Sequence, residues 1–215
     1  MLLEYFSGKA TAQDVAIWIL AIVLSITVHE AAHAWTAYWA GDLTPKERRR
    51  LSLNPIDHLD PLGTMMLLFS HFGWGRPVEV NPANFRHPRR DGILVALCGP
   101  LSNLGLAVVF ALIARGAAHA AMGKAGAGVW VVLLQVACTF VLLNLGLMMF
   151  NLLPVPPLDG SHIVAGLLPV HLAQRYERLA MPIAVLILAV LIFSGALGVI
   201  IFPVVRALYT ALTGF

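Results

Sequence analysis

The residues with the clearest chemical potential form the short pattern His29-Glu30-Ala31-Ala32-His33. Residues four apart share one face of a helix, so His29 and His33 can bind the same metal ion. Glu30 lies about 100° around the helix from His29, close enough to reach a metal-bound water. In soluble metalloproteases this spacing supplies two zinc ligands and the general base. The pattern therefore predicts a hydrolytic zinc site.

The surroundings of this pattern strengthen the prediction. The pattern lies inside a long apolar segment, where a central acidic residue costs about 2.5–3.5 kcal/mol on insertion scales. Such a cost favours a functional role. The alternative is a hydrogen-bonded polar patch that holds two helices together.

A zinc site needs a third protein ligand, and Asp159 is the best candidate. It is the only acidic residue between Asp91 and Glu177. Three prolines in the stretch 154–157 precede it and break any helix there. Irregular backbone at membrane depth is tolerated only where protein or a wet cavity covers it. Asp159 is therefore expected to face the histidines, with a turn that caps the next helix as the alternative.

The composition indicates a membrane protein. Of the 215 residues, 59% are hydrophobic and only 12% are charged, whereas an average soluble domain has about 25% charged residues. This excludes a disordered chain and an ordinary soluble domain. The net charge of +3 is better explained by loops that face anionic lipid than by nucleic acid. Cys98 and Cys138 lie in apolar runs and do not indicate a secreted disulfide framework.

Four long segments have the apolar character of membrane spans: residues 15–40, 92–114, 125–158 and 179–205. Residues 62–72 are too short to cross and are predicted to form a re-entrant or interfacial helix, with a short tilted span as the alternative. The sequence thus predicts an all-α polytopic membrane protein with about four full transmembrane helices.

The loops predict the orientation. If residues 62–72 do not span, ten Lys and Arg residues fall on one side and four on the other. The richer side is expected to be cytoplasmic. Only seven residues, or about 10 Å of helix, separate His33 from Ala40. The metal site is therefore expected nearer the cytoplasmic face, from which water can reach it.

Three motifs together resemble the site-2 protease family of intramembrane zinc metalloproteases. They are the pattern at residues 29–33, Gly99-Pro100-Leu-Ser-Asn103, and the stretch from Asn151 to Gly160, which reads NLLPVPPLDG. Residues 73–81 also look like the family's sequence between the first two motifs. The resemblance covers about residues 25–165.

The resemblance implies a role for each matching residue. His29, His33 and Asp159 would bind one Zn²⁺, and Glu30 would activate the bound water. Asn151 would donate a hydrogen bond to the substrate carbonyl or the developing oxyanion. Asn103 would be a supporting polar group. Outside the motifs, His162 follows Asp159 by three residues and is a candidate supporting group or an interfacial histidine.

The resemblance further implies that the substrate is a transmembrane segment of another membrane protein. Residues 77–81 alternate in character and are predicted to form a strand-like segment that pairs with the unwound substrate. No PDZ or cystathionine-synthase-like module is evident. We therefore expect one membrane-embedded domain, residues 1–215, in a prokaryotic cell membrane. Its catalytic core would cover about residues 15–165, with a C-terminal helical segment at 179–215.

Two other functions remain open from the sequence. A metal transporter also places His and Glu on transmembrane helices, but conduction requires a second polar cluster along the path. A non-catalytic scaffold that binds membrane segments is a further alternative, against which the intact Glu30 argues.

Overall fold

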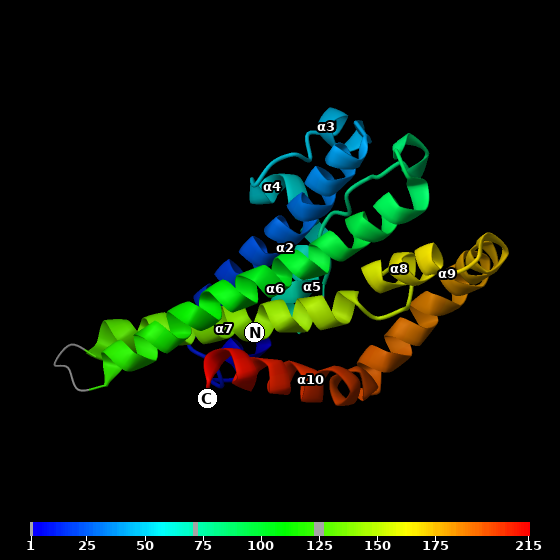
Figure 1. Cartoon of the computed structure of the whole chain (residues 1–215). Coiled ribbons are helices and arrows are strands. Elements are labelled where there is room, and N and C mark those ends of the chain that lie inside the picture. The colour runs from blue at the N-terminus through cyan, green and yellow to red at the C-terminus, as the bar shows by residue number, and fades with distance from the viewer. Residues whose placement is uncertain (1, 71–72, 123–126) are drawn as a thin grey trace.

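The computed structural model describes residues 2–70, 73–122 and 127–215 and is built from helices (Figure 1). These are α1 (Leu2–Phe6), α2 (Ala12–Ala40), α3 (Thr44–Glu47), α4 (Pro55–His58), α5 (Pro61–Ser70), α6 (Pro88–Ala121), α7 (Ala127–Asn151), α8 (Asp159–Leu167), α9 (Val170–Phe193) and α10 (Ala196–Thr213), with a 3-10 turn at Pro82–Asn84. Four of them, α2, α6, α7 and α10, are long and apolar enough to cross a membrane. The all-α polytopic fold is therefore confirmed.

Helix α6 lies at the centre and packs against α2, α7, α8 and α10. Small residues allow this close packing, since Ala107 and Ala111 of α6 meet Val141 and Leu145 of α7 in a fully buried cluster. Val205 of α10 joins the same cluster. The apolar interior is thus shared by three of the four long helices.

Helix α2, which carries the histidine pair, has well-defined ends. Thr11 and Asp14 form a reciprocal capping box, in which each side chain accepts a hydrogen bond from the other residue's backbone N–H. Gly41 ends the helix with a left-handed φ of 112°. The helix therefore starts three residues before the predicted segment and ends where it was predicted to end.

The prediction of one span at residues 179–205 is wrong. That stretch is divided between α9 and α10, because Gly195 adopts a left-handed φ of 74° that interrupts the helix. The fourth helix able to span is α10, which lies against α6 and α7. Its C-terminal end is held by Arg115 of α6, whose Nε donates to the Thr213 carbonyl at 3.2 Å.

The two short predicted elements differ in outcome. Helix α5 has ten residues and extends about 15 Å, too little to cross a bilayer. This agrees with the prediction for 62–72, of which residues 71–72 lie outside the described residues. Residues 77–81 form no paired strand; among the described residues the only bridge near them joins Leu59 to Gly75.

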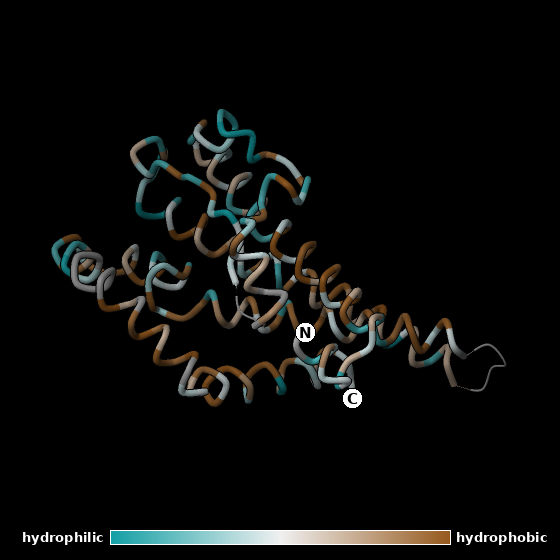
Figure 2. The backbone as a smooth tube through the Cα atoms, turned by 180° about the vertical axis from the view of Figure 1, so that it is seen from behind, coloured by the Kyte–Doolittle hydropathy of each residue, from teal (hydrophilic) through white to brown (hydrophobic). Residues whose placement is uncertain are grey.

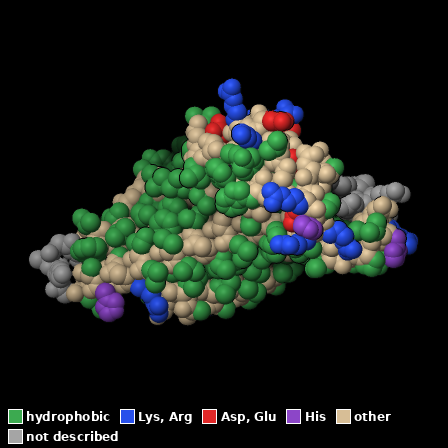
Figure 3. Space-filling view, turned by 45° about the horizontal axis from the view of Figure 1, so that its top comes forward, with side chains coloured by type: hydrophobic (Ala, Val, Ile, Leu, Met, Phe, Trp, Pro, Cys, Tyr) green, Lys and Arg blue, Asp and Glu red, His purple; other side chains and the backbone are tan. Residues whose placement is uncertain are grey.

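Polar and apolar surfaces are separated along the molecule. Hydrophobic residues follow the long helices, and hydrophilic ones gather in the connections after α2 and before α6 (Figure 2). The space-filling view shows charged side chains at the top of the molecule and along the adjoining right-hand side, next to a flank covered by hydrophobic side chains (Figure 3). This division suits a protein embedded in a bilayer.

Candidate metal centre

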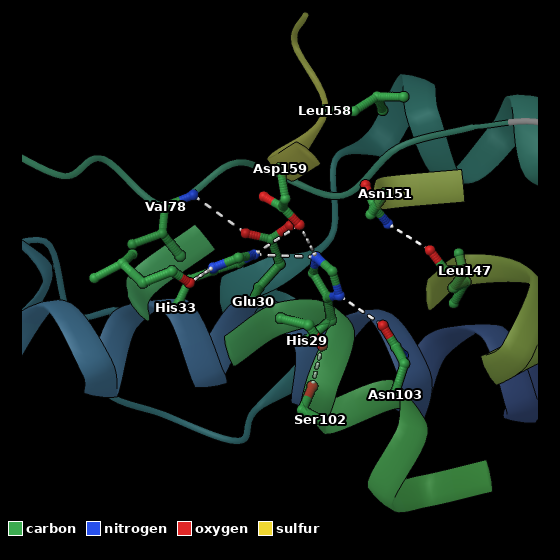
Figure 4. Close-up of polar contacts among 12 residues, drawn as sticks. His29, Glu30, His33, Val78, Ser102, Asn103, Leu147, Asn151, Leu158 and Asp159 are labelled. Atoms are coloured by element: carbon green, nitrogen blue, oxygen red, sulfur yellow. Dashed lines mark hydrogen bonds and ion pairs between the residues drawn. The ribbon is translucent and has the colours of Figure 1, made fainter. Parts of the chain in front are cut away.

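Three side chains from two helices converge inside the bundle (Figure 4). His29 Nε2 lies 3.1 Å from His33 Nε2 and 3.2 Å from Asp159 Oδ2, and His33 Nε2 lies 3.3 Å from the same oxygen. Each histidine is only 7% exposed. Within the described ranges, they form the only group of three or more side chains able to share a metal ion.

The spacing of these atoms matches a tetrahedral zinc site. Zinc lies about 2.0–2.2 Å from nitrogen and oxygen ligands. At the tetrahedral angle, such ligands are about 3.3–3.5 Å apart. The three donor atoms here are 3.1–3.3 Å apart, which is close to the spacing that one zinc ion would require of three ligands.

Hydrogen bonds on the far side of each imidazole set its protonation. His29 Nδ1 lies 2.6 Å from Asn103 Oδ1, and His33 Nδ1 lies 2.8 Å from the Val95 carbonyl. Both acceptors are oxygens, so each Nδ1 donates, and each Nε2 of the neutral imidazole is then available as a metal ligand. The buried Asp159 Oδ2 has no hydrogen-bond donor of its own. Three electron-rich atoms therefore face one point, which fits a divalent cation.

A buried amide pair orients His29. Asn103 Nδ2 donates to Asn144 Oδ1 at 2.8 Å, which turns Asn103 Oδ1 toward the imidazole. Asn144 Nδ2 in turn donates to Ser25 Oγ at 2.8 Å and to the Phe140 carbonyl at 2.9 Å. Sequence reasoning identified Asn103 but missed Asn144 and Ser25. Asn144 did carry a signal, because an uncharged amide inside an apolar span is itself uncommon.

Two glycines allow the close approach of these elements. A Cβ at Gly99 would lie 2.3 Å from His33 Nε2 and 2.7 Å from His29 Cε1, so α6 meets α2 only with glycine here. A Cβ at Gly160 would lie 2.3 Å from the Leu152 carbonyl oxygen. The chain can therefore fold back behind Asp159.

Asp159 lies at the start of a helix and does not cap it, since the N-cap position is Leu158 and no side-chain cap hydrogen bond forms. Helix α7 ends at Asn151, irregular backbone follows, and Asp159 is the first residue of α8. Helix α8 packs on α6, which brings the carboxylate to the histidine pair. Asp159 thus begins a helix and faces the histidines at once.

Glu30 lies beside the three residues and is held from the other side of the site. Its Oε2 accepts the Val78 backbone N–H at 3.2 Å (Figure 4). A Cβ at Gly75 would lie 3.4 Å from its Oε1. The extended segment that contains residues 77–81 therefore runs next to this carboxylate.

Two of the candidate residues do not contact the three converging side chains in the described structure. Asn151 Nδ2 donates to the Leu147 carbonyl of its own helix at 3.0 Å and is directed toward that residue (Figure 4). His162 is exposed on α8 and lies outside the three-residue group.

Comparison with known proteins places this geometry in a family. Peptidase family M50 matches residues 65–192, a range that includes Asn103 and Asp159. A Bacillus subtilis protein named "Putative zinc metalloprotease YwhC" is 46% identical over 153 residues, covering 70% of this chain and 68% of the relative. Proteins named "Putative zinc metalloprotease Rip2" from Mycolicibacterium smegmatis and Mycobacterium tuberculosis are 32% and 33% identical, covering 86% and 87% of this chain and 70% of each relative. No solved structure matches.

The chain belongs to peptidase family M50. It is a membrane-embedded zinc metalloprotease, as the resemblance implied, and its substrate is a protein. Zinc is its cofactor, and the grouped side chains of His29, His33 and Asp159 fit that ion. The comparisons do not favour the transporter or the scaffold.

Proposed function

We propose that His29, His33 and Asp159 are the zinc ligands of this intramembrane protease and that Glu30 is its general base. The observation that carries the proposal is the convergence of three lone-pair atoms, each histidine being fixed by a hydrogen bond on its other nitrogen. Bound zinc lowers the pKa of a water molecule toward about 7 and polarises the scissile carbonyl.

Glu30 moves the proton during hydrolysis. Its Oε2 is engaged by the Val78 N–H, and Oε1 has no hydrogen bond in the described structure. Oε1 accepts the proton of the attacking water and passes it to the leaving amine. The Val78 N–H supports this role because it holds the carboxylate in one orientation.

We assign the transmembrane segment of another membrane protein as the substrate. Its helix must unwind before a carbonyl can approach the site, and the freed backbone then needs new hydrogen-bond partners. In the described structure, the backbone N–H groups of Glu79 and Val80 donate to no backbone acceptor. Residues 77–81 therefore serve as the edge on which the extended substrate pairs.

Asn151 completes the proposed catalytic group. Its amide nitrogen uses one proton for the Leu147 carbonyl, and the second proton is available for the developing oxyanion. One such donor contributes about 3–4 kcal/mol to transition-state stabilisation. Asn103 supports His29, and His162 remains a candidate supporting group at the start of α8.

The site is proposed to open to the cytoplasm of a prokaryotic cell. The loops at residues 41–60 and 76–91 support this orientation because they contain eight of the 14 Lys and Arg residues. Water would then reach the site from the end at which α2 terminates. The whole chain, residues 1–215, is proposed to act as one membrane-embedded protease domain.

The test is cleavage of a model transmembrane substrate by the reconstituted protein. We expect Glu30→Gln to retain about one zinc per chain but to lose at least about 100-fold in rate, since it cannot accept a proton. The exposed Glu47→Gln on α3 serves as the matched control and should cleave normally. Cleavage that survives Glu30→Gln, or metal flux in liposomes without cleavage, would reject the proposal.

A further inference from the structure

Arg50 is the one member of the basic run at residues 48–50 that is buried. Arg50 is only 4% exposed, whereas Arg48 and Arg49 are exposed. Taking a guanidinium out of water is costly unless its donors are satisfied. In the part of the chain that the structure describes, no carboxylate lies within salt-bridge distance of Arg50. A simple role in attracting anionic lipid does not explain this placement.

The guanidinium joins two loops through their backbones. Nη1 donates to the Asp57 carbonyl and Nη2 donates to the Arg76 carbonyl. The planar fork of arginine suits such a pair of acceptors, which a lysine could not bridge in the same way. Arg50 therefore links the connection around α4 to the segment that follows α5.

Other contacts hold the same two loops together. The Arg76 N–H donates to the His58 carbonyl at 2.8 Å, and Leu59 and Gly75 form a backbone bridge. His58 is fully buried, and its Nε2 lies 2.8 Å from the Ser52 carbonyl. The backbone at residues 75–76 is thereby fixed from one side.

The backbone that follows this fixed segment contacts Glu30 of α2. Gly75 lies so close to α2 that a Cβ there would be 2.7 Å from Ile26 Cγ2. Two residues after Arg76, the Val78 N–H donates to Glu30 Oε2 at 3.2 Å. Burial lowers the pKa of Arg50, and the charge of Glu30 partly opposes this shift.

We propose that Arg50 is a positioning residue of the protease, which holds the backbone of residues 75–78 so that the Val78 N–H orients Glu30. The proposal rests on the role of Glu30 given above. Arg50 touches neither the zinc ligands nor the water that Glu30 serves. It acts on the rate of the chemical step through the backbone between Arg76 and Val78.

The first experiment separates this role from general support of the fold. Arg50→Gln is compared with the exposed neighbour Arg49→Gln in the reconstituted full-length protein, using a model transmembrane substrate. For Arg50→Gln we expect kcat to fall by about 10–100-fold, with KM changed by less than about 3-fold and about one zinc per chain retained. Arg49→Gln should match the wild type in all three quantities.

The second experiment asks whether Arg50 acts through Val78. Val78→Pro removes the N–H that Glu30 accepts, and it should lower kcat to a similar extent. If both residues serve one contact, the double variant should be no slower than the slower single variant. Losses that multiply in the double variant would overturn the proposal. So would a normal kcat in Arg50→Gln, or loss of zinc together with activity.

The positioning role and the proposed function can fail separately. An inactive Glu30→Gln beside a fully active Arg50→Gln would reject the positioning role and leave the proposed function standing. An active Glu30→Gln would reject the proposed general base, whatever Arg50→Gln does.

Discussion

At the scale of single residues, the site depends on the side chains that orient the proposed ligands as much as on the proposed ligands themselves. His29 presents Nε2 because Asn103 accepts its Nδ1 proton, and Asn103 is turned that way by Asn144. Asn103 and Asn144 are both fully buried. An unpaired amide in such a place would lose stability, so the chain of hydrogen bonds acts as a unit.

Removing the outer amide should therefore weaken zinc binding. Asn144→Leu keeps a similar volume but takes away the acceptor for Asn103 Nδ2, so Asn103 can turn from His29. We expect zinc affinity to fall about 10-fold, measured by competition with a chelator of known affinity. Gln135→Leu is the matched control, because Gln135 also links α7 to α2, through Gln13 and Asp14, away from the site. Equal zinc affinity in the two variants would contradict this account.

At the scale of elements, the short helix α8 delivers the carboxylate. It has nine residues and is too short to be stable alone, so its position comes from packing on α6. Gly166 lies so close to α6 that a Cβ would be 2.4 Å from Ile93 Cγ1. Arg89 of α6 donates to the Gly166 and Leu168 carbonyls at the end of α8, where a cation is favourable.

Loss of the contacts at the C-terminal end of α8 should also change the position of Asp159 at its N-terminal end. In Arg89→Ala the carbonyls of Gly166 and Leu168 at the end of α8 lose this donor. Because Arg89 is exposed, we expect a modest fall of about 3–10-fold in zinc affinity. Arg90→Ala removes an adjacent exposed arginine and should have no such effect. Zinc titrations that do not distinguish the two variants would show that Arg89 plays no part in placing Asp159.

At the scale of the whole molecule, one ion would join parts of the chain that are far apart in sequence. The proposed ligands lie on α2 and α8, and α6 packs against both of these helices. A ligand that binds only the folded state stabilises it by RT ln(1 + [L]/Kd), or about 2.7 kcal/mol at 100 times Kd. Zinc is therefore expected to contribute to the stability of the bundle as well as to catalysis.

Metal removal gives the corresponding measurement. A chelator should lower the Tm of the detergent-solubilised protein by several degrees, and added zinc should restore it. His33→Ala should start with the lower Tm and should not respond to the chelator. His119→Ala lies on α6, outside the three-residue group, and should respond as the wild type does. A wild-type Tm that is the same with and without zinc would show that the ion does not bridge α2 and α8.

Local patterns in the sequence determine much of this protein by themselves. The position of His29 and His33 on one face follows from the helical period, which depends on neighbouring residues alone. The long apolar segments predict that the protein lies in a membrane, and they predict three of the four helices that are able to span it. Asp159 can be singled out because no other acidic residue occurs near it in the sequence. The missed break at Gly195 is also local, but a glycine does not by itself reveal a left-handed φ.

Other features are decided only by tertiary structure, because they depend on groups that are distant in sequence. Asn144 reaches Ser25 across 119 positions, and Arg50 reaches the Arg76 carbonyl across 26. The basic run at residues 48–50 does not indicate which arginine is buried. An apolar span likewise does not indicate which of its amide side chains faces a histidine. The helical period by itself places His29 and His33 on one face. Only the packing of α2, α6, α7 and α8 brings Asp159 to them and fixes the positions of all three side chains.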